Sequence, residues 1–410
     1  KEQAQTTHII DAFVTHKLWG FPIFFFLMWL MFYCTFNIGA YPQEWIETLV
    51  GWIGSGLQQA MPDGAFKDLL IDGVIGGVGS VIVFLPNIMI LYLFISFMED
   101  SGYLARAAFI MDRVMHRIGL HGKSFIPLIM GFGCNVPAIM ASRTIESRSS
   151  RLITILITPF MSCSARIPIY LLLAGTFFAA DASLVMIGLY VLGVVLAVVT
   201  ARLMRRFMFP VDETPFVMEL PPYRLPTWKT TLTHMWDKCA QYLRKMGGMI
   251  LIASMVVWFL SYYPRSEEGG TAAHYENSYL GRLGQSCAPV FTPLGLNWKA
   301  GVALLSGVPA KEIVVSTMAV LSNSGDDDAS LAENLQKQVY TQGDKAGQPV
   351  YSPLVAYTLM LFILLYVPCI AAIVAIRREA GRKWAALSVV YSTGLAWLLS
   401  FVVYQIGSWL

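Results

Sequence analysis

Three cysteines lie beside proline, glycine or serine inside apolar stretches of the chain. Cys134 belongs to the run Gly131–Pro137, Cys163 lies between two serines shortly after Pro159, and Cys369 directly follows a proline. Breaking a helix in lipid frees backbone amides and carbonyls, and such a break is usually tolerated only where it lines a cavity. Sulfur ligands favour soft or borderline transition metals, whereas Mg²⁺ and Ca²⁺ take oxygen ligands. We therefore expect a divalent iron-group metal to be the cargo of a path along these breaks.

The residues at the breaks divide into two sets by their chemistry. The candidate lining of the metal path carries sulfur, hydroxyl, amide or carboxylate groups: Met130, Cys134, Asn135, Met161, Ser162, Cys163, Glu312 and Cys369. The residues expected to shape or gate the breaks are Gly131, Gly133, Pro137, Pro159, Arg166, Pro309, Lys311 and Pro368. Because a cargo must also be released, we expect one or two sulfur ligands with carbonyls and water, not a closed thiolate cage.

Ionisable side chains at the breaks leave two interpretations open. Lys311 and Glu312 lie in an apolar segment, where charged groups are costly and by default functional. Glu312 is either a cation ligand or proton acceptor, or the partner of Lys311 or Arg166 in an ion pair that fixes the structure. For Arg166 we expect hydrogen bonds to freed carbonyls or to a carboxylate.

Each cysteine also has a simpler alternative role, as a small buried hydrophobe. That is our interpretation of Cys34, Cys239 and Cys287, and packing is likewise the expected role of most of the 20 methionines. The six cysteines are dispersed without short paired spacings, which argues against a disulfide framework or a structural zinc site. The apolar stretches contain no histidine, so a thiol nucleophile lacks a base.

The composition requires a lipid environment for these elements. Hydrophobic residues make up 56% of the 410 residues and charged residues only 13%, against roughly 45–50% and about 25% in average globular proteins. The net charge of +3 is too small to indicate nucleic acid as a partner. We expect an all-α polytopic membrane protein in contact with the lipid bilayer. Windows of about 20 apolar residues predict spans at Leu18–Ile38, Val78–Met98, Leu152–Phe178, Leu184–Met204, Met249–Tyr263, Pro353–Ile376 and Trp384–Ile406.

An internal repeat organises the chain. Ser101–Arg106 recurs as Asn277–Arg282, and Ile118–Lys123 aligns without a gap to Leu294–Lys299. The shared apolar positions step by three and four, which predicts two amphipathic surface helices. Each is followed by a short apolar segment interrupted by glycine and proline, which we interpret as re-entrant or discontinuous: Phe125–Met140 and Ala300–Leu321. Two such gate-type repeats of inverted topology are typical of transporters.

The distribution of charge predicts the orientation. The linkers rich in Lys and Arg, at 206–247 and around Arg377–Lys383, should face the cytoplasm, as should the N-terminus. Acidic loops around Glu44–Asp72 and Asp326–Asp328 should face outward. We expect four regions. Residues 1–17 form a cytoplasmic linker from a missing N-terminal domain, and residues 18–205 form the first span and the first gate repeat. Residues 206–247 form a basic linker with an amphipathic helix at Trp228–Lys245, and residues 248–410 form the second gate repeat with a flexible external loop at 323–350. That amphipathic helix receives a soluble regulatory domain or lies on the lipid surface.

The motifs resemble the membrane domain of the bacterial ferrous iron transport protein B (FeoB) family. They are Gly131–Ala138 with Arg143-Thr144, Pro159–Arg166, Gly307–Glu312 and the Trp19-Gly20-x-Pro22 opening, so the resemblance covers nearly the whole chain. It implies Fe²⁺ uptake across the bacterial inner membrane, with the motif cysteines facing the iron path. It also implies an N-terminal G-protein domain that binds GTP with Mg²⁺, small cytoplasmic accessory proteins, and an oligomeric state left open, a homo-oligomer included. No GxxxxGK[ST] phosphate loop is present, so no residue here is assigned to GTP and this chain is not expected to be an enzyme.

Two rival functions remain open. Gate-type repeats alone do not name a substrate, so an ion-coupled carrier of an organic solute such as a nucleoside is one alternative. A G-domain-regulated receptor or an intramembrane enzyme is the other. Against an enzyme, the spans contain no HExxH motif and no Ser/His or Cys/His set.

Overall fold

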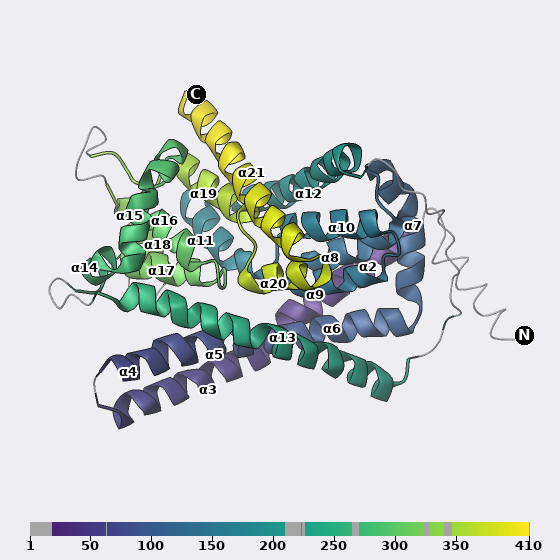
Figure 1. The fold of residues 1–410 in the computed structure, drawn as a ribbon, viewed down its shortest axis with the longest axis horizontal. Coiled ribbons are helices and arrows are strands. Elements are labelled where there is room, and N and C mark those ends of the chain that lie inside the picture. Colours follow the sequence, from purple (N-terminus) through teal and green to yellow (C-terminus); the bar gives the residue numbers. More distant parts are fainter. Residues whose placement is uncertain are drawn as a thin grey trace, which may run out of the picture. The chain divides into compact units, whose positions relative to one another are not determined.

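The computed structural model describes residues 19–62, 64–209, 223, 226–264, 270–322, 328–339 and 347–409. Within these residues the secondary structure is helical, apart from an isolated bridge between Val339 and Pro349. The chain forms two compact units (Figure 1). Unit 1 comprises residues 1–158 and 197–251, and unit 2 comprises residues 159–196 and 252–410.

Unit 1 contains the helices of the first half of the chain. They are α2 (Gly20–Tyr33), a π-helical turn (Cys34–Ile38), α3 (Gly39–Ala60), α4 (Ala65–Asp68), a second π-helical segment (Leu69–Ile75), α5 (Gly76–Val83), α6 (Leu85–Asp100), α7 (Tyr103–Ile118), α8 (Phe125–Gly131), α9 (Asn135–Ala141) and α10 (Arg148–Ile157). Short 3₁₀ turns lie at Gly122–Ser124, Ser142–Thr144 and Thr158–Phe160. Two long helices, α12 (Ala182–Phe207) and α13 (Trp228–Tyr262), each contribute residues to both units.

Unit 2 contains the remaining helices. They are α11 (Ile167–Phe177), α14 (Gly270–Asn277), α15 (Tyr279–Phe291), α16 (Trp298–Ser306), α17 (Ile313–Leu321), α18 (Asp328–Lys337), α19 (Pro353–Leu365), α20 (Ile370–Glu379) and α21 (Arg382–Trp409), with 3₁₀ turns at Ser164–Arg166 and Thr292–Leu294. The central helix is α19, on which α11 and α21 pack.

Helices long and apolar enough to cross a membrane match the predicted spans in most places. Six such helices are found among the described residues: Gly20–Ala60, Arg148–Phe177, Ala182–Phe207, Trp228–Tyr262, Pro353–Glu379 and Arg382–Trp409. The predicted span Val78–Met98 is different, because the chain breaks at Phe84 between α5 and α6, and α6 then bends by 85° into α7. Counting that bent pair as one span gives up to seven.

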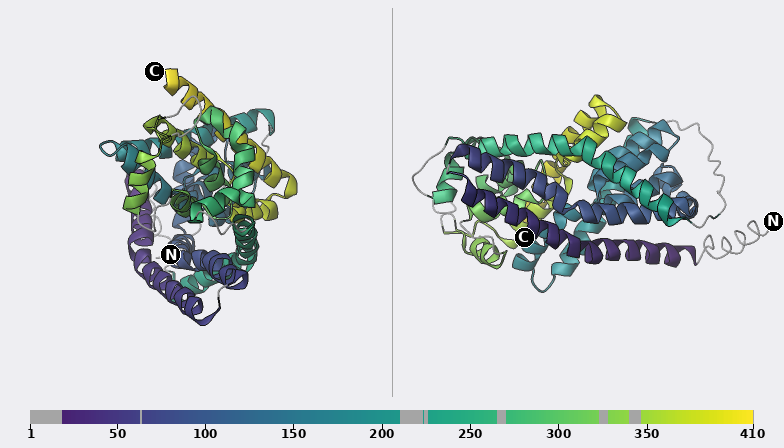
Figure 2. Two further views of the ribbon diagram at one scale, coloured as in Figure 1. Left: turned by 90° about the vertical axis from the view of Figure 1, so that its left-hand side faces the viewer. Right: turned by 90° about the horizontal axis from the view of Figure 1, so that it is seen from below.

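The first helix is apolar on every side, as expected of a helix in lipid. Phe24, Met28 and Met31, spaced by four and three residues, are buried against α6 and α7. On the other side Phe25 and Trp29 are 64% and 57% exposed. An aqueous surface does not accept such a row of bare aromatic side chains, whereas lipid does. Through the π-helical turn, α2 continues into α3 (Figure 2).

Close packing of α21 on α19 depends on small side chains. Ala385, Ser388, Ser392, Ala396 and Ser400 lie on one face of α21 and are buried. In lipid, small residues let two helix backbones approach closely, and dispersion then stabilises the pair where hydrophobicity cannot. The α19 side of this contact is a continuous set of buried apolar residues, Leu359–Leu365.

The internal repeat is visible in the backbone. Gly119 ends α7 and Gly295 ends the turn after α15, and these aligned glycines have positive φ values of 87° and 72°. In both copies the next residue makes the same hydrogen bond, from Leu120 N to Met115 O (2.9 Å) and from Leu296 N to Phe291 O (3.2 Å). A left-handed residue followed by this bond terminates a helix, and glycine adopts it without a steric penalty.

Two expected loops are helical instead. The acidic stretch after the first span forms a hairpin of α3 with α4 and α5, which lie side by side in Figure 1, and only its tip lacks helical structure among the described residues. Part of the expected flexible loop 323–350 is helix α18, which packs on α11. Leu331 and Leu335, one turn apart, are buried, and Gln336 Nε2 donates to Thr176 O at 2.7 Å. Two apolar residues at helical spacing in a short polar segment were too weak a signal to predict it.

The expected regional boundaries also differ from the units. Residues 159–196, which we placed in the first repeat, belong to unit 2 because α11 packs on α17, α18 and α19. The boundary expected at 247/248 falls inside α13, so the amphipathic stretch from Trp228 and the span after it are one helix. The expected linker 1–17 lies outside the described residues, as does most of 210–225.

Candidate functional site

The first break lies in unit 1 between α8 and α9. Its turn is Phe132–Cys134, and the amides of Gly133 and Cys134 both donate to Met130 O at 3.0 Å. Cys134 has extended backbone and precedes the first residue of α9. Glycine at 133 allows a close approach to α6, because a Cβ there would lie 2.9 Å from the end of the Leu91 side chain, which would have to shift. The sequence thus breaks this helix where it meets α6.

Cys134 and Asn135 have different surroundings at this break. The Cys134 side chain is partly buried and packs against the apolar cluster that includes Phe24 and Met130, near the buried Tyr92. Asn135 is buried, and with its amide nitrogen toward the neighbouring carbonyls it donates to Gly131 O (3.1 Å) and Thr158 O (3.2 Å). Those bonds use the Asn135 side chain to satisfy backbone carbonyls at two helix ends.

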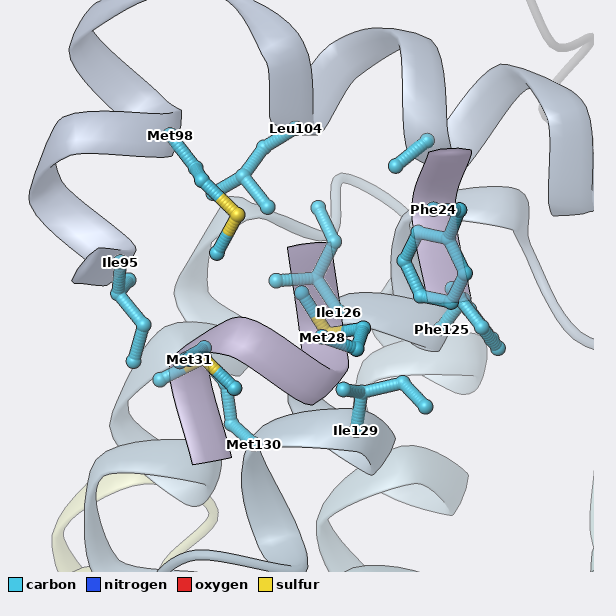
Figure 3. Close-up of a pocket in the computed structure, with 11 residues that line it drawn as sticks. Phe24, Met28, Met31, Ile95, Met98, Leu104, Phe125, Ile126, Ile129 and Met130 are labelled. Carbon is cyan, nitrogen blue, oxygen red and sulfur yellow. The ribbon is translucent and has the colours of Figure 1, made fainter. Parts of the chain in front are cut away.

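Met130 lies in an apolar environment. It lines a small cavity of about 20 Å³ whose surrounding side chains are all apolar, and Met28, Met31 and Met98 line the same cavity (Figure 3). These four thioethers come from α2, α6 and α8, with the rings of Phe24 and Phe125 beside them. Methionine commonly fills irregular gaps of this kind in an apolar core. Met130 therefore has the surroundings of a side chain that packs in an apolar core.

The second break separates α10 from α11 at Pro159–Arg166, in unit 2. Arg166 is 1% exposed, and its guanidinium donates to Pro159 O (3.2 Å) and Met161 O (3.4 Å). The planar fork of arginine reaches two carbonyls of one loop at once. Met161 itself is buried, and Cys163 is partly buried with its carbonyl accepting from Arg166 N at 3.1 Å.

Hydroxyl groups gather beside this break. Ser162 Oγ and Tyr170 Oη are buried and have no hydrogen-bond partner among the described residues, and the same holds for Arg166 Nε. The Ser162 hydroxyl lies near those of Tyr170 and Tyr190. Hydroxyl groups of Ser162, Tyr170 and Tyr190 thus form a largely buried polar group beside the second break.

The third break separates α16 from α17 at Gly307–Glu312. Lys311 is 2% exposed, its Nζ donates to Val367 O at 2.7 Å, and the same atom lies 3.3 Å from the centroid of the Tyr366 ring. The ammonium group is thus held by a carbonyl and an aromatic face, both of which attract cations. Glu312 is partly exposed and begins α17. Among the described residues, Glu312 forms no ion pair with Lys311 or Arg166, so of its two alternative roles the structural ion pair is not the one present.

The fourth break separates α19 from α20 at Tyr366–Cys369 and joins the third. Ile370 N donates to Val308 O at 3.1 Å, and Tyr366 Oη donates to Leu304 O at 3.4 Å. Cys369 is partly buried and precedes α20. The two breaks of the second repeat therefore satisfy each other's freed backbone groups, directly and through Lys311.

Unit 2 brings three of the four breaks together. Lys311 is close enough to Arg166, Cys163 and Cys369 to interact with them electrostatically, and the Cys163 and Cys369 thiols influence each other in the same way. Cys134, Met130 and Asn135 belong to unit 1. The sequence reasoning missed Tyr170, Tyr190 and Tyr366. A usable signal was the position of Tyr366 two residues before the Pro368-Cys369 pair.

No closed metal cage is present in the part of the chain that the structure describes. No three His, Cys, Asp or Glu side chains there are grouped so that they could hold an ion together.

Comparison with known proteins gives consistent matches. The family model Gate, described as nucleoside recognition, matches residues 81–177 and 243–383, and the model for the ferrous iron transport protein B C terminus matches 186–238. The Fe(2+) transport protein A/Fe(2+) transporter FeoB fusion protein of Porphyromonas gingivalis is 56% identical over 99% of this chain and 52% of its own length. Fe(2+) transporter FeoB of Campylobacter jejuni is 41% identical over 98% of this chain and 65% of its length. Fe(2+) transporter FeoB of Methanocaldococcus jannaschii is 40% identical over 98% of this chain and 59% of its own length. The chain thus spans about half to two thirds of these relatives, and no solved structure matches it.

Proposed function

This chain belongs to the FeoB family, as a membrane part built on Gate repeats, and we propose that it forms the path by which ferrous iron crosses the membrane. Its relatives are named Fe(2+) transporters, which supports Fe²⁺ as the cargo. Uptake is directed into the bacterial cytoplasm across the inner membrane, with the N-terminus on the cytoplasmic side and the two repeats of inverted topology.

The observation that carries this proposal is the cluster at the breaks of unit 2. Cys163 and Cys369 come from segments about two hundred residues apart in the chain, yet lie together beside Lys311. Sulfur with backbone and hydroxyl oxygen suits a borderline ion such as Fe²⁺ and suits Mg²⁺ poorly. An incomplete ligand set also permits release, which conduction requires. Ser162 and Glu312 are further ligand candidates in this cluster, and Cys134 lines the path at the break of unit 1.

Lys311 acts as a gating residue in this proposal. Its ammonium occupies a position where a carbonyl and an aromatic ring attract a cation. A divalent ion placed beside it is repelled by an ammonium at that position. Movement of iron past Cys163 and Cys369 therefore requires the Lys311 side chain to move away, with Arg166 kept in place by its two carbonyl partners.

Regulation lies outside this chain. We propose that a G-protein domain elsewhere in the full protein binds GTP with Mg²⁺ and controls the path. The P. gingivalis relative is named as a fusion with Fe(2+) transport protein A, which supports small accessory proteins of that kind as partners. Assembly of several copies is compatible with this arrangement.

Anoxic uptake into proteoliposomes tests the proposal. The full-length protein is compared with the Cys163→Ser plus Cys369→Ser variant, and with the matched control Cys239→Ser plus Cys287→Ser, for Fe²⁺, Mn²⁺ and Mg²⁺, with and without GTP. We expect Fe²⁺ uptake that the first pair of substitutions abolishes and the control pair preserves. Full uptake in the first variant would remove the cysteines from the path, and a lack of uptake of any metal by the wild type would overturn the function.

A carrier of an organic solute is the second candidate. It is favoured by the description of the Gate model as nucleoside recognition and by the buried hydroxyls of Ser162 and Tyr170, which lack partners among the described residues. Uptake of radiolabelled nucleosides by the same proteoliposomes separates the two functions. Nucleoside uptake that survives the cysteine substitutions would establish the carrier.

A further inference from the structure

A cavity of about 410 Å³ lies in unit 1 among α6, α7, α8, α9 and α13. Its volume is in the range of sites for organic ligands, which is about 300–1,000 Å³. It is distinct from the break cluster of unit 2, since every lining residue belongs to unit 1.

Basic side chains form part of the cavity lining. They are Lys123, Arg143 and Lys238, with Glu99 as the single acidic lining residue. Lys238 Nζ donates to Glu99 Oε2, and Lys123 Nζ donates to Glu146 Oε1, each at 2.7 Å. The carboxylate side chains are 53% and 72% exposed, and exposed pairs of this kind are weak. A phosphate can therefore replace either carboxylate as the partner of its lysine.

Apolar side chains form a larger part of the lining. They include Leu104, Ile126, Met130 and Met140, together with the ring of Tyr92. Tyr92 and Glu99 lie seven residues apart on α6, which corresponds to about 10 Å along a helix axis. Along α6 the lining therefore extends over roughly the length of a short acyl segment.

This mixed lining selects the occupant. Lys123 and Lys238 are each paired with one carboxylate and Arg143 adds a third cation, so the site has no excess of acidic groups that would attract Fe²⁺. A free anion would use the basic groups and leave the apolar lining uncovered. An amphiphile with a phosphate head and a hydrocarbon tail matches both kinds of lining residue, and basic pockets between helices on the cytoplasmic side are known to suit anionic lipid headgroups.

We propose that this cavity binds an anionic phospholipid of the cytoplasmic leaflet, with its phosphate at Lys123, Arg143 and Lys238 and an acyl chain beside Leu104, Ile126 and Met140. The assignment to that leaflet rests on the proposed orientation. Because Met130 and Pro137 line the cavity on the two sides of the first break, the bound lipid lies against α8 and α9 where they separate.

Native mass spectrometry of the detergent-purified full-length protein tests this site. The probes are phosphatidylglycerol, phosphatidylcholine with the same chains, and inorganic phosphate. We expect one phosphatidylglycerol to bind at least tenfold more tightly than phosphatidylcholine, and Arg143→Gln plus Lys238→Gln to weaken it by about fivefold for each charge removed. Arg377→Gln plus Lys383→Gln, which removes two exposed charges in unit 2, is the matched control and should leave binding unchanged.

A cavity-filling variant separates a lipid from a free anion. Ala105→Phe should displace the acyl chain and abolish lipid binding while all charges remain, and Ala141→Leu serves if that variant does not fold. The proposal is overturned if both lipids bind equally, if the control weakens binding as much as the charge variant, or if neither filling variant alters it. Binding of inorganic phosphate alone, insensitive to both filling variants, would assign the basic side chains to a soluble anion.

Discussion

Lys311 Nζ donates a hydrogen bond to Val367 O at 2.7 Å, across 56 residues of sequence. This bond joins the break between α16 and α17 to the break between α19 and α20. It provides the freed carbonyl with a donor and holds the Lys311 amino group over the Tyr366 ring. The same bond therefore contributes to stability and fixes the Lys311 side chain beside the two cysteines of the proposed iron path.

Removing the Lys311 ammonium should affect stability and transport separately. Lys311→Met removes the donor to the partly buried Val367 O, and the loss of such a hydrogen bond costs about 0.5–1.5 kcal/mol. Lys299→Met is the matched control, since Lys299 Nζ donates to Leu321 O at 3.0 Å away from the breaks. We expect both variants to melt at lower temperature in detergent, and only Lys311→Met to change the rate of Fe²⁺ uptake. Equal uptake rates for the two variants would remove Lys311 from gating.

Arg166 should not be replaceable by lysine. Its guanidinium bonds two carbonyls of the second break from two separate nitrogens, whereas lysine carries all its donors on one nitrogen at the end of a differently shaped chain and does not reproduce that fork. Arg166→Lys is expected to cost about 1–3 kcal/mol and Arg166→Met more. Thermal unfolding of the two variants measures this order. If the Arg166→Lys variant is as stable as the wild type, only the charge of this side chain matters.

The glycines with positive φ should rank by the space around them. Gly381, at φ 101°, has nothing within 4 Å of an added Cβ, so Gly381→Ala reports backbone strain alone, about 1–2 kcal/mol. Gly119→Ala adds a contact with the flexible Arg205 side chain at 3.0 Å. Gly295→Ala also collides with the Tyr404 ring, which is less free to move. Melting temperatures should fall in the order Gly381, Gly119, Gly295, and an equal loss at all three would contradict the contact argument.

His121, in the turn between α7 and α8, should make the protein sensitive to mild acid. Its Nδ1 accepts from Lys123 N at 3.2 Å, which requires the neutral ring, and burial followed by the charge of Lys123 lowers the pKa of His121. A His whose pKa is lowered by folding binds fewer protons in the folded state, so stability falls as pH drops below about 6.5. His121→Asn keeps an acceptor without titrating and should flatten the melting temperature between pH 7 and 5. An unchanged pH slope in this variant would assign the sensitivity to other groups.

The small-residue face of α21 should not tolerate bulk. Ala396 is fully buried on this face, and Ala396→Leu forces α21 away from its neighbours at a cost of about 1–3 kcal/mol. Leu398→Ala, at a side chain 53% exposed on the same helix, is the control and should have little effect. Thermal unfolding of both variants in detergent measures the difference. A larger loss from the control would indicate that the exposed face is covered by protein in the full assembly.

Local features of the sequence were the most predictable. Glycine and proline predicted the breaks at Cys134 and Lys311, because these residues terminate helices wherever they stand. The aligned repeat predicted equivalent helix ends, and Gly119 and Gly295 have the same backbone conformation and the same following hydrogen bond. These predictions are confirmed because each depends on a few neighbouring residues.

Long-range features were less predictable. The ion pair considered as one role of Glu312 does not form, and Lys311 and Arg166 instead bond to backbone carbonyls. Helix α18 forms in a polar segment because Leu331 and Leu335 find a surface on α11. In each case the group that is actually contacted is far away in the chain. Neither the periodicity nor the charge pattern of a segment reveals which distant group its side chains contact.

The sequence by itself determined that this chain is a polytopic helical membrane protein with broken, repeated gate segments. The apolar composition requires a lipid environment, and glycine and proline determine where the helices break. Neither property depends on contacts between distant parts of the chain. The tertiary structure alone decided which breaks share a unit. Because α11 packs on α17 and α19, Cys163 lies with Cys369 and Lys311 in unit 2, whereas Cys134 belongs to unit 1. That grouping comes from the fit of helix surfaces that are distant in sequence, and it has no signature in any one segment.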